Sequence, residues 1–183
     1  HETVLVVSNK PNVPGLERAS RLDLPSLVVE HRRNGQNITR EEHELEIIKG
    51  LADHDIELIV LAGYMRLLSP VFLNEWQHRV VNIHPSLLPH FPGGHAHRDV
   101  LSSKTSITGC TVHLVDEGMD TGAVLAQCAV PVFDDDDEIS LSDRVKVEEH
   151  RLYPEVLTWI AEGRVHLTEE GILVQDETDR FVC

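Results

Sequence analysis

Four short apolar runs, separated by segments with helical spacing, constrain the fold of this chain more than any other feature. The runs cover residues 3–8, 26–30, 56–62 and 79–84. The first is β-branched and apolar on both faces, which is typical of a buried parallel strand. Residues 15–22, 39–52 and 70–76 suit the intervening helices. Strands that alternate with helices form βαβ units, so the sequence predicts an α/β protein with a Rossmann-like, mostly parallel sheet.

The second of these helices has a clear start signal. Thr39 suits the N-cap position, and the acidic residues Glu41 and Glu42 follow in the first turn, where the helix dipole favours them. The polar segment 31–37 before it is predicted to be a loop. The buried stripe of the helix is predicted to contain Leu45, Ile48, Leu51 and Ala52.

The pattern changes in the second half of the chain. An irregular connection follows residue 84 and contains Pro89, Pro92, Gly93 and Gly94. Residues 107–115 and 123–130 then indicate two strands around a short loop, which predicts an antiparallel hairpin. A long amphipathic helix over residues 139–161 and weak strands at 165–167 and 172–174 complete the pattern. The parallel sheet is therefore expected to continue into an antiparallel part.

Composition excludes several classes of function. Sixteen basic residues against 31 acidic ones give a net charge of −15, whereas nucleic-acid binding needs a basic face. No apolar run approaches the ~20 residues that span a bilayer, and no signal peptide is visible. The cysteines, at 110, 128 and 183, are odd in number and widely spaced, which argues against a disulfide framework. We expect a cytoplasmic protein with neither a nucleic-acid nor a membrane partner.

The first candidate site residues stand at the end of the fourth apolar run. Asn82 and His84 are two positions apart, so they project to one side of a strand. Pro85 keeps His84 extended and ends the strand. Because ligands bind at the carboxyl ends of strands in open α/β sheets, an amide and an imidazole would face one crevice. Alternatively, both side chains satisfy backbone groups at the strand end.

Asp120 is the next candidate, in the loop 116–122 of the predicted hairpin. A carboxylate there could favour a nearby imidazolium and order a water molecule that shuttles a proton. Aspartate and glycine are also ordinary turn residues, so turn formation alone is the alternative explanation.

The segments that contain Asn82, His84 and Asp120 resemble those of a known protein family. The run Asn82-Ile-His-Pro-Ser-Leu-Leu-Pro89 resembles the signature of folate-dependent formyltransferases. Residues 61–70 resemble the segment upstream of it in glycinamide ribonucleotide transformylases. The stretches 109–113, 116–122 and 149–150 match in order and spacing, so the similarity runs from about residue 4 to 163.

The flanking residues favour the ribonucleotide enzymes within this family. Methionyl-tRNA formyltransferases are expected to carry Arg-Gly-x-Ala-Pro shortly after the signature, where this chain has Phe91-Pro-Gly-Gly-His-Ala-His-Arg98. Formyltetrahydrofolate hydrolases usually show His-His-Ser-Phe-Leu-Pro, and Pro85 stands here in place of the second histidine.

The resemblance implies a formyltransferase fold in a single domain over residues 1–183. Residues 1–78 would form a nucleotide-binding half and residues 79–183 a catalytic and folate-binding half. By this resemblance, the strand, phosphate-binding loop and helix with which the family begins would be missing ahead of the first strand. The reaction implied is formyl transfer from the co-substrate 10-formyltetrahydrofolate to glycinamide ribonucleotide in purine biosynthesis, without a metal, by a monomer or homodimer.

The resemblance also implies roles for individual residues. Asn82, His84 and Asp120 would be catalytic. The folate would contact Met65, Arg66, Leu67, Leu68, Val115, Asp116, Glu117 and Gly118. The ribonucleotide side would include Arg40, Pro85, Ser86 and Glu149. Supporting positions would be His95, Thr111 and His113.

For three of these residues a simpler explanation stays open. Arg66 could be a surface arginine that lies over the sheet, Arg40 an exposed residue at a helix start, and Glu149 a solvent-facing helix residue.

Other functions stay open as alternatives. They are a formyltetrahydrofolate hydrolase and a non-catalytic folate- or nucleotide-binding module. A metal site among His84, His90, His95, His97 and His113 is disfavoured, because no zinc-binding spacing and no His-Glu-x-x-His motif occurs.

Overall fold

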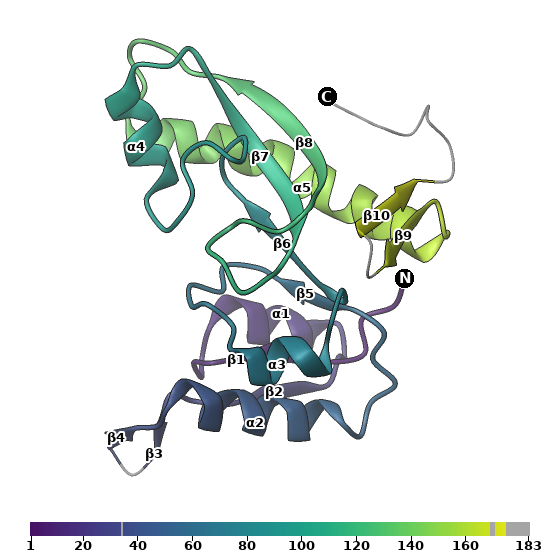
Figure 1. The fold of residues 1–183 in the computed structure, drawn as a ribbon. Coiled ribbons are helices and arrows are strands. Elements are labelled where there is room, and N and C mark those ends of the chain that lie inside the picture. Colours follow the sequence, from purple (N-terminus) through teal and green to yellow (C-terminus); the bar gives the residue numbers. More distant parts are fainter. Residues whose placement is uncertain (34, 169–170, 175–183) are drawn as a thin grey trace. The chain divides into compact units, whose positions relative to one another are not determined.

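The computed structural model describes the chain except for residues 34, 169–170 and 175–183. The chain divides into two compact units (Figure 1). The first contains His1–Leu58 and Leu68–Gln77, and the second contains Ile59–Leu67 and His78–Cys183. The expected halves, divided at residue 78, stay a prediction, and residues 59–67 belong to the second unit.

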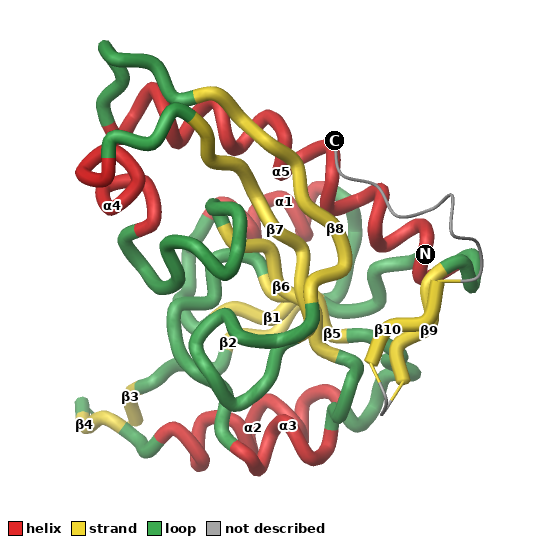
Figure 2. Tube along the Cα trace, turned by 45° about the horizontal axis from the view of Figure 1, so that its top comes forward, coloured by secondary structure: helices red, strands yellow, loops and turns green. Residues whose placement is uncertain are grey.

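The first unit is built on two parallel strands, β1 (Val6–Ser8) and β2 (Ser26–Val28), joined by α1 (Pro14–Arg21). Helix α2 (Arg40–Leu51) packs beside α3 (Pro70–Glu75). Figure 2 shows α1 on one side of the strand pair and α2 with α3 on the other. The βαβ order predicted for this region is confirmed. The segment predicted to be a loop contains a short hairpin, β3 (Arg32–Arg33) and β4 (Gln36–Asn37).

Helix α2 begins as predicted but buries a different face. Thr39 and Glu42 form a reciprocal capping box, which confirms the predicted start. The predicted buried stripe is only partly right: Leu51 is buried, but Leu45 and Ala52 are exposed, and the fully buried side chains include His43 and Glu44. Both find partners: His43 Nε2 donates to the Val29 carbonyl over 2.8 Å, and Glu44 accepts from the backbone N–H of Ser69 over 3.0 Å. These bonds offset the cost of burying polar groups.

The second unit contains a four-stranded sheet in the order β5-β6-β7-β8. Strand β5 (Ile59–Leu61) pairs parallel with β6 (Val80–His84), while β7 (Ile107–Leu114) and β8 (Val124–Pro131) add antiparallel to it. The predicted change from parallel to antiparallel is confirmed. Helix α4 (Ala96–Ser103) stands in the connection predicted to be irregular. The neighbouring prolines and glycines hide this two-turn helix from sequence reasoning.

One face of this sheet carries the main core. Helix α5 (Glu138–Ala161) lies along the hairpin of β7 and β8 (Figure 1). Alternate strand residues point toward it, as the two-residue period of a strand requires. The strand side chains buried in this cluster are Cys110, Val112, Ala126, Cys128 and Val130. The helix contributes Leu141, Val145, Leu152, Val156 and Trp159. Strands β9 (Val165–Thr168) and β10 (Gly171–Val174) follow the helix as a small antiparallel pair.

The opposite face of the same sheet is polar. Asn82 of β6 pairs in register with His113 of β7, and His84 pairs with Thr111. Thr111 pairs in turn with Gln127 of β8. Since residues directly opposite each other in a sheet share a face, these five side chains gather on the side away from α5.

Candidate functional site

His84 stands at the carboxyl end of β6, with both ring nitrogens engaged. Its Nε2 lies 2.9 Å from the backbone carbonyl of Phe91. A carbonyl only accepts, so Nε2 carries the proton and the ring tautomer is fixed. Its Nδ1 lies 3.4 Å from Oδ2 of Asp120. The side chain is 5% exposed, so this pairing is little screened by solvent.

Asp120 brings a carboxylate between two imidazoles. Its Oδ2 also accepts the backbone N–H of Gly93 over 2.7 Å, and its Oδ1 lies 3.7 Å from Nε2 of His113. Its backbone is left-handed, with φ 54°, a conformation that aspartate tolerates better than most residues. Gly122 closes the same loop, where a Cβ would lie 1.9 Å from the carbonyl oxygen of Leu114. The loop conformation is thus what aims this carboxylate at the sheet.

His113 orients the amide of Asn82. Its Nδ1 donates to the carbonyl of Leu114 over 2.7 Å, which leaves Nε2 as an acceptor. The Asn82 amide nitrogen donates to this atom over 3.2 Å. Burial lowers the pKa of His113, although the bond to Leu114 and the charge of Asp120 oppose the effect. A neutral His113 therefore holds Asn82, and the amide is fixed beside His84.

Ser86 and the loop 85–91 support the ring of His84. Ser86 is buried, and its hydroxyl donates to the carbonyl of His90 over 2.6 Å. The contact of the same hydroxyl with the Phe91 carbonyl is 3.2 Å long. The Ser86 side chain, which the resemblance places at the ribonucleotide, is thus occupied within its own loop. Pro85 is half-buried beside it.

An apolar strip borders the carboxylate. Met65 and Met119 are 73% and 54% exposed. A Cβ built on Gly94 would lie 3.1 Å from Cε of Met65, and one on Gly93 would lie 3.0 Å from Sδ of Met119. The two glycines therefore leave a side-chain-free strip between two thioethers. Asp120 touches this strip directly, through its bond to the Gly93 N–H.

The other residues expected at the site differ in their contacts and in their exposure to solvent. Val115 donates its backbone N–H to Val80, and the Asp116 carboxylate accepts from Gly118 within the loop. Leu67 and Glu117 are exposed, and Arg66 is half-buried. His95 is exposed at the N-cap of α4.

Glu149, Arg40 and Leu68 take part in none of the bonds described above. Burial raises the pKa of Glu149, and the charges of His150, Lys146 and His84 oppose that rise. Arg40 begins α2 and pairs with Glu41 at 3.8 Å, so it belongs to the first unit. Leu68 is buried and belongs to that unit as well.

Sequence reasoning missed three residues that the structure connects to this site. Met119 borders the glycine strip, and its place directly before Asp120 was the available signal. Gln127 stands on β8, and its side-chain amide donates a hydrogen bond to the Leu88 carbonyl in the loop that follows β6. The Tyr153 hydroxyl of α5 lies 2.9 Å from the carbonyl of Leu61 and 3.0 Å from that of Val81, directly before Asn82. No sequence pattern pointed to these last two.

In the described part of the chain, no three His, Cys, Asp or Glu side chains are arranged to hold a metal ion. Within the same residues, no helix is long and apolar enough to cross a membrane.

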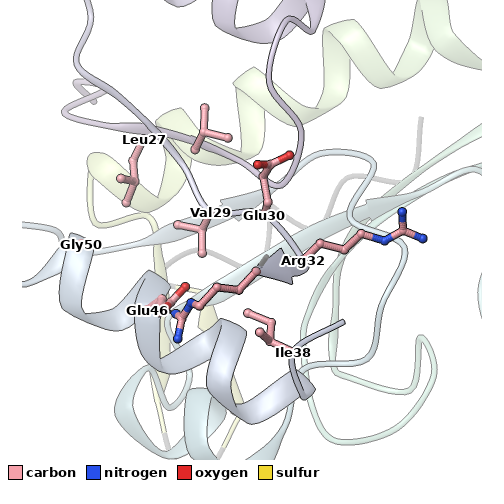
Figure 3. Close-up of a pocket in the computed structure, with 9 residues that line it drawn as sticks. Leu27, Val29, Glu30, Arg32, Ile38, Glu46 and Gly50 are labelled. Carbon is pink, nitrogen blue, oxygen red and sulfur yellow. Dashed lines mark ion pairs between the residues drawn. The ribbon is translucent and has the colours of Figure 1, made fainter. Parts of the chain in front are cut away.

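The first unit contains a separate cavity of about 350 Å³ (Figure 3). Leu27, Val29 and Ile38 form its apolar part, and the ion pair of Arg33 with Glu46 lies at its edge. None of the residues that line it belongs to the polar face of the β5–β8 sheet.

Comparison with known proteins places this geometry in context. The profile of the formyl transferase family matches residues 1–157. A trifunctional purine biosynthetic protein adenosine-3 of Drosophila melanogaster is 46% identical over 92% of this chain, which spans 12% of that relative's length. A phosphoribosylglycinamide formyltransferase of Escherichia coli (strain K12) is 39% identical over 91% of this chain and 77% of its own length. The crystal structure of glycinamide ribonucleotide transformylase 1 from Symbiobacterium toebii has a TM-score of 0.87 at 37% identity, covering 94% of this chain and 80% of that one.

Proposed function

The chain belongs to the formyl transferase family, and from that premise we propose that it transfers the formyl group of 10-formyltetrahydrofolate to the amino group of glycinamide ribonucleotide. The observation that carries this proposal is the convergence of Asn82, His84 and Asp120. The carboxylate lies 3.4 Å from the imidazole, and the amide stands two residues away on the same face of the sheet.

The chemistry needs a donor for negative charge and a path for one proton. The amine nitrogen bonds to the formyl carbon, the bond from that carbon to the folate nitrogen breaks, and one proton passes from the amine to that nitrogen. Negative charge gathers on the formyl oxygen between the two events. The proposed donors to that oxygen are the Asn82 amide and, when it carries a proton, Nδ1 of His84; a preorganised donor contributes about 3 kcal/mol to such a transition state.

Asp120 and His84 form the proton-handling pair. With Nε2 committed to the Phe91 carbonyl, Nδ1 is the ring atom that gains or loses a proton, and it faces the carboxylate. Asp120 stabilises the imidazolium form by its charge. It can also order a water molecule that relays the proton between the two nitrogens of the reaction.

The strip beside Asp120 suits the flat ring of a folate. Gly93 and Gly94 present backbone without side chains, and thioethers such as those of Met65 and Met119 pack well against aromatic rings. A ring placed there would hold its formyl group next to the carboxylate. We propose that Leu67 and the backbone of residues 115–118 complete this folate side, and that Glu149 contacts the ribonucleotide.

A spectroscopic assay tests the proposal. Absorbance that reports release of tetrahydrofolate is followed with both substrates and then without the ribonucleotide. We expect turnover that requires the amine and that falls about 100- to 10,000-fold in His84→Ala. Turnover without the amine would identify a hydrolase instead. Binding of both ligands by dialysis or calorimetry, with no turnover of either, would identify a non-catalytic binding module and refute the proposal.

A further inference from the structure

Gln127 is bonded to the loop that follows the catalytic strand. It stands on β8, in the cross-strand row that runs from His84 through Thr111 to Gln127. Its side-chain nitrogen lies 2.9 Å from the Leu88 carbonyl and 2.9 Å from the Thr111 hydroxyl oxygen. An amide nitrogen has two hydrogens, so both are used, one on the loop and one on β7.

The Thr111 hydroxyl connects this amide to the same loop by two further bonds. It donates to the Ser86 carbonyl over 2.6 Å and accepts the backbone N–H of Leu88 over 3.0 Å. Together with the bond from Gln127, the hydroxyl makes three hydrogen bonds, which is the full capacity of one donor and two acceptor positions. Thr111 and Gln127 thus hold residues 86 and 88 against the sheet.

The held loop ends at the carbonyl that fixes His84. Ser86 donates to the carbonyls of His90 and Phe91, and the His90 N–H donates to Leu87 over 3.0 Å. The Phe91 carbonyl then accepts from Nε2 of His84. A continuous set of bonds therefore leads from the amide of Gln127 to the protonated nitrogen of the ring. The amide itself is not among the groups that surround His84 and Asp120.

We propose that Gln127 is a positioning residue, which acts through Thr111 and the loop 85–91 to hold the Phe91 carbonyl against His84. Without the amide, the Leu88 carbonyl loses its donor and the Thr111 hydroxyl loses the bond that orients it, so the loop is released and the Phe91 carbonyl no longer selects one tautomer of the ring. Nδ1 then no longer presents a single protonation state to Asp120. The effect on turnover rests on the proposed function, whereas the effect on the ring does not.

The side chain must donate twice for this role. Gln127→Met keeps the length and most of the volume but has no N–H group. Gln127→Glu keeps the shape but, when ionised, only accepts, so it faces the Leu88 carbonyl without a proton. Both substitutions should therefore release the loop. A residue that merely fills space would tolerate methionine.

The test uses two readouts on the purified protein. Nitrogen-15 NMR of labelled histidine reports which ring nitrogen of His84 carries the proton, and steady-state kinetics separate kcat from KM. In Gln127→Met we expect the His84 signal to change from the Nε2–H form to a tautomer mixture. We also expect kcat to fall about 10- to 100-fold, as for other displacements of a catalytic group, with KM changed less than about twofold.

Two threonines of β7 provide a matched control. Thr111→Val should reproduce the effect of Gln127→Met, while Thr111→Ser, which keeps the hydroxyl, should restore both readouts. Thr108 is also buried on β7, and its hydroxyl makes no hydrogen bond within the described residues. Thr108→Val should therefore leave the tautomer and kcat unchanged. If Gln127→Met does not fold, the Thr111 pair decides the question.

The outcomes separate this inference from the proposed function. A Gln127→Met protein with the wild-type His84 signal and wild-type kcat would overturn the inference, as would equal effects of Thr108→Val and Thr111→Val. A wild-type protein without formyl transfer would refute the proposed function, and the NMR comparison would then decide the positioning role alone.

Discussion

The Nδ1 atom of His84 lies 3.4 Å from Oδ2 of Asp120, while the opposite ring nitrogen is bonded to the Phe91 carbonyl. The ring is therefore held from both sides, by a fixed acceptor on one and a negative charge on the other. A rotation of the ring would break both contacts, so the charge acts on one defined atom. Removal of that charge should affect the chemical step rather than substrate binding.

Asp120→Asn tests this expectation. The amide keeps an oxygen that can accept the Gly93 N–H but removes the charge beside His84. We expect kcat to fall about 100- to 10,000-fold, with a much smaller change in KM. Asp143→Asn is the control, because Asp143 is exposed on α5 and pairs only with Lys146 among the contacts described. Normal turnover by Asp120→Asn would show that the carboxylate has no catalytic part.

One buried and one half-buried histidine predict how stability depends on pH. Burial lowers the pKa of His113 and of His97 from the ordinary value of 6.5. The unfolded chain then binds more protons than the folded one, so the free energy of unfolding is highest above pH 6.5 and falls as the pH drops below it. Urea unfolding between pH 5 and 8 measures this slope. His97→Gln should flatten it.

Glu149 should act in the opposite direction. Burial raises the pKa of its carboxyl above the ordinary value of 4.5, so its contribution to stability is present below pH 4.5 and is lost as the pH rises through the folded pKa. Glu149→Gln should therefore make the dependence on pH steeper above pH 4.5. A flatter profile in Glu149→Gln, or a steeper one in His97→Gln, would contradict these assignments.

Tyr153→Phe should reduce stability without a change of core volume. The Tyr153 hydroxyl lies within hydrogen-bond distance of carbonyls on β5 and β6, and burial raises the pKa of the phenol. Its removal should cost about 1 kcal/mol of unfolding free energy, and more if a carbonyl is left without a partner. Thr158→Val is the control on the same helix. Its exposed hydroxyl bonds only to the carbonyl of Pro154, so a change within about 0.5 kcal/mol is expected.

Gly109→Ala should be severely destabilising, because of a close approach between strands. A Cβ at this position would lie 1.9 Å from the carbonyl oxygen of Cys128, so β7 and β8 would have to separate. We expect a loss of more than about 2 kcal/mol in urea unfolding. Gly15 lies in α1 with no atom within 4 Å of its Cβ position. Gly15→Ala should therefore stabilise the protein, by up to about 1 kcal/mol.

The fold was predictable where apolar periodicity dominates. The strands β1, β2, β5, β6 and β7 lie within the predicted runs, although several are shorter, and β8 ends one residue beyond its run. The prediction of the buried face of α2 was partly wrong, because His43 and Glu44 are buried and form hydrogen bonds with Val29 and Ser69. Such partners come from segments that are distant in the sequence, so the spacing of apolar residues cannot predict them.

The candidate site was predictable only in part. The two-residue period of a strand was enough to put Asn82 and His84 on one face. The approach of Asp120 to His84 depends on a left-handed backbone in its loop and on the register of β7 against β6. Neither can be predicted from the spacing of residues in the sequence. Gln127 lies 39 residues from its acceptor at Leu88, so its connection to the loop appears only when β8 is in place.

Alternate residues of strand β7 lie on opposite sides of the sheet, one set in the core and the other on the polar face. Cys110 and Val112 face α5, while Thr111 and His113 face the other way. A shift of one residue would bury the histidine against the helix and expose the valine. The bulge between Val112 and His113 opposes such a shift. Protein that regains its native core after denaturation should consequently regain the arrangement of the polar face in equal proportion, with no stable, compact fraction that lacks it.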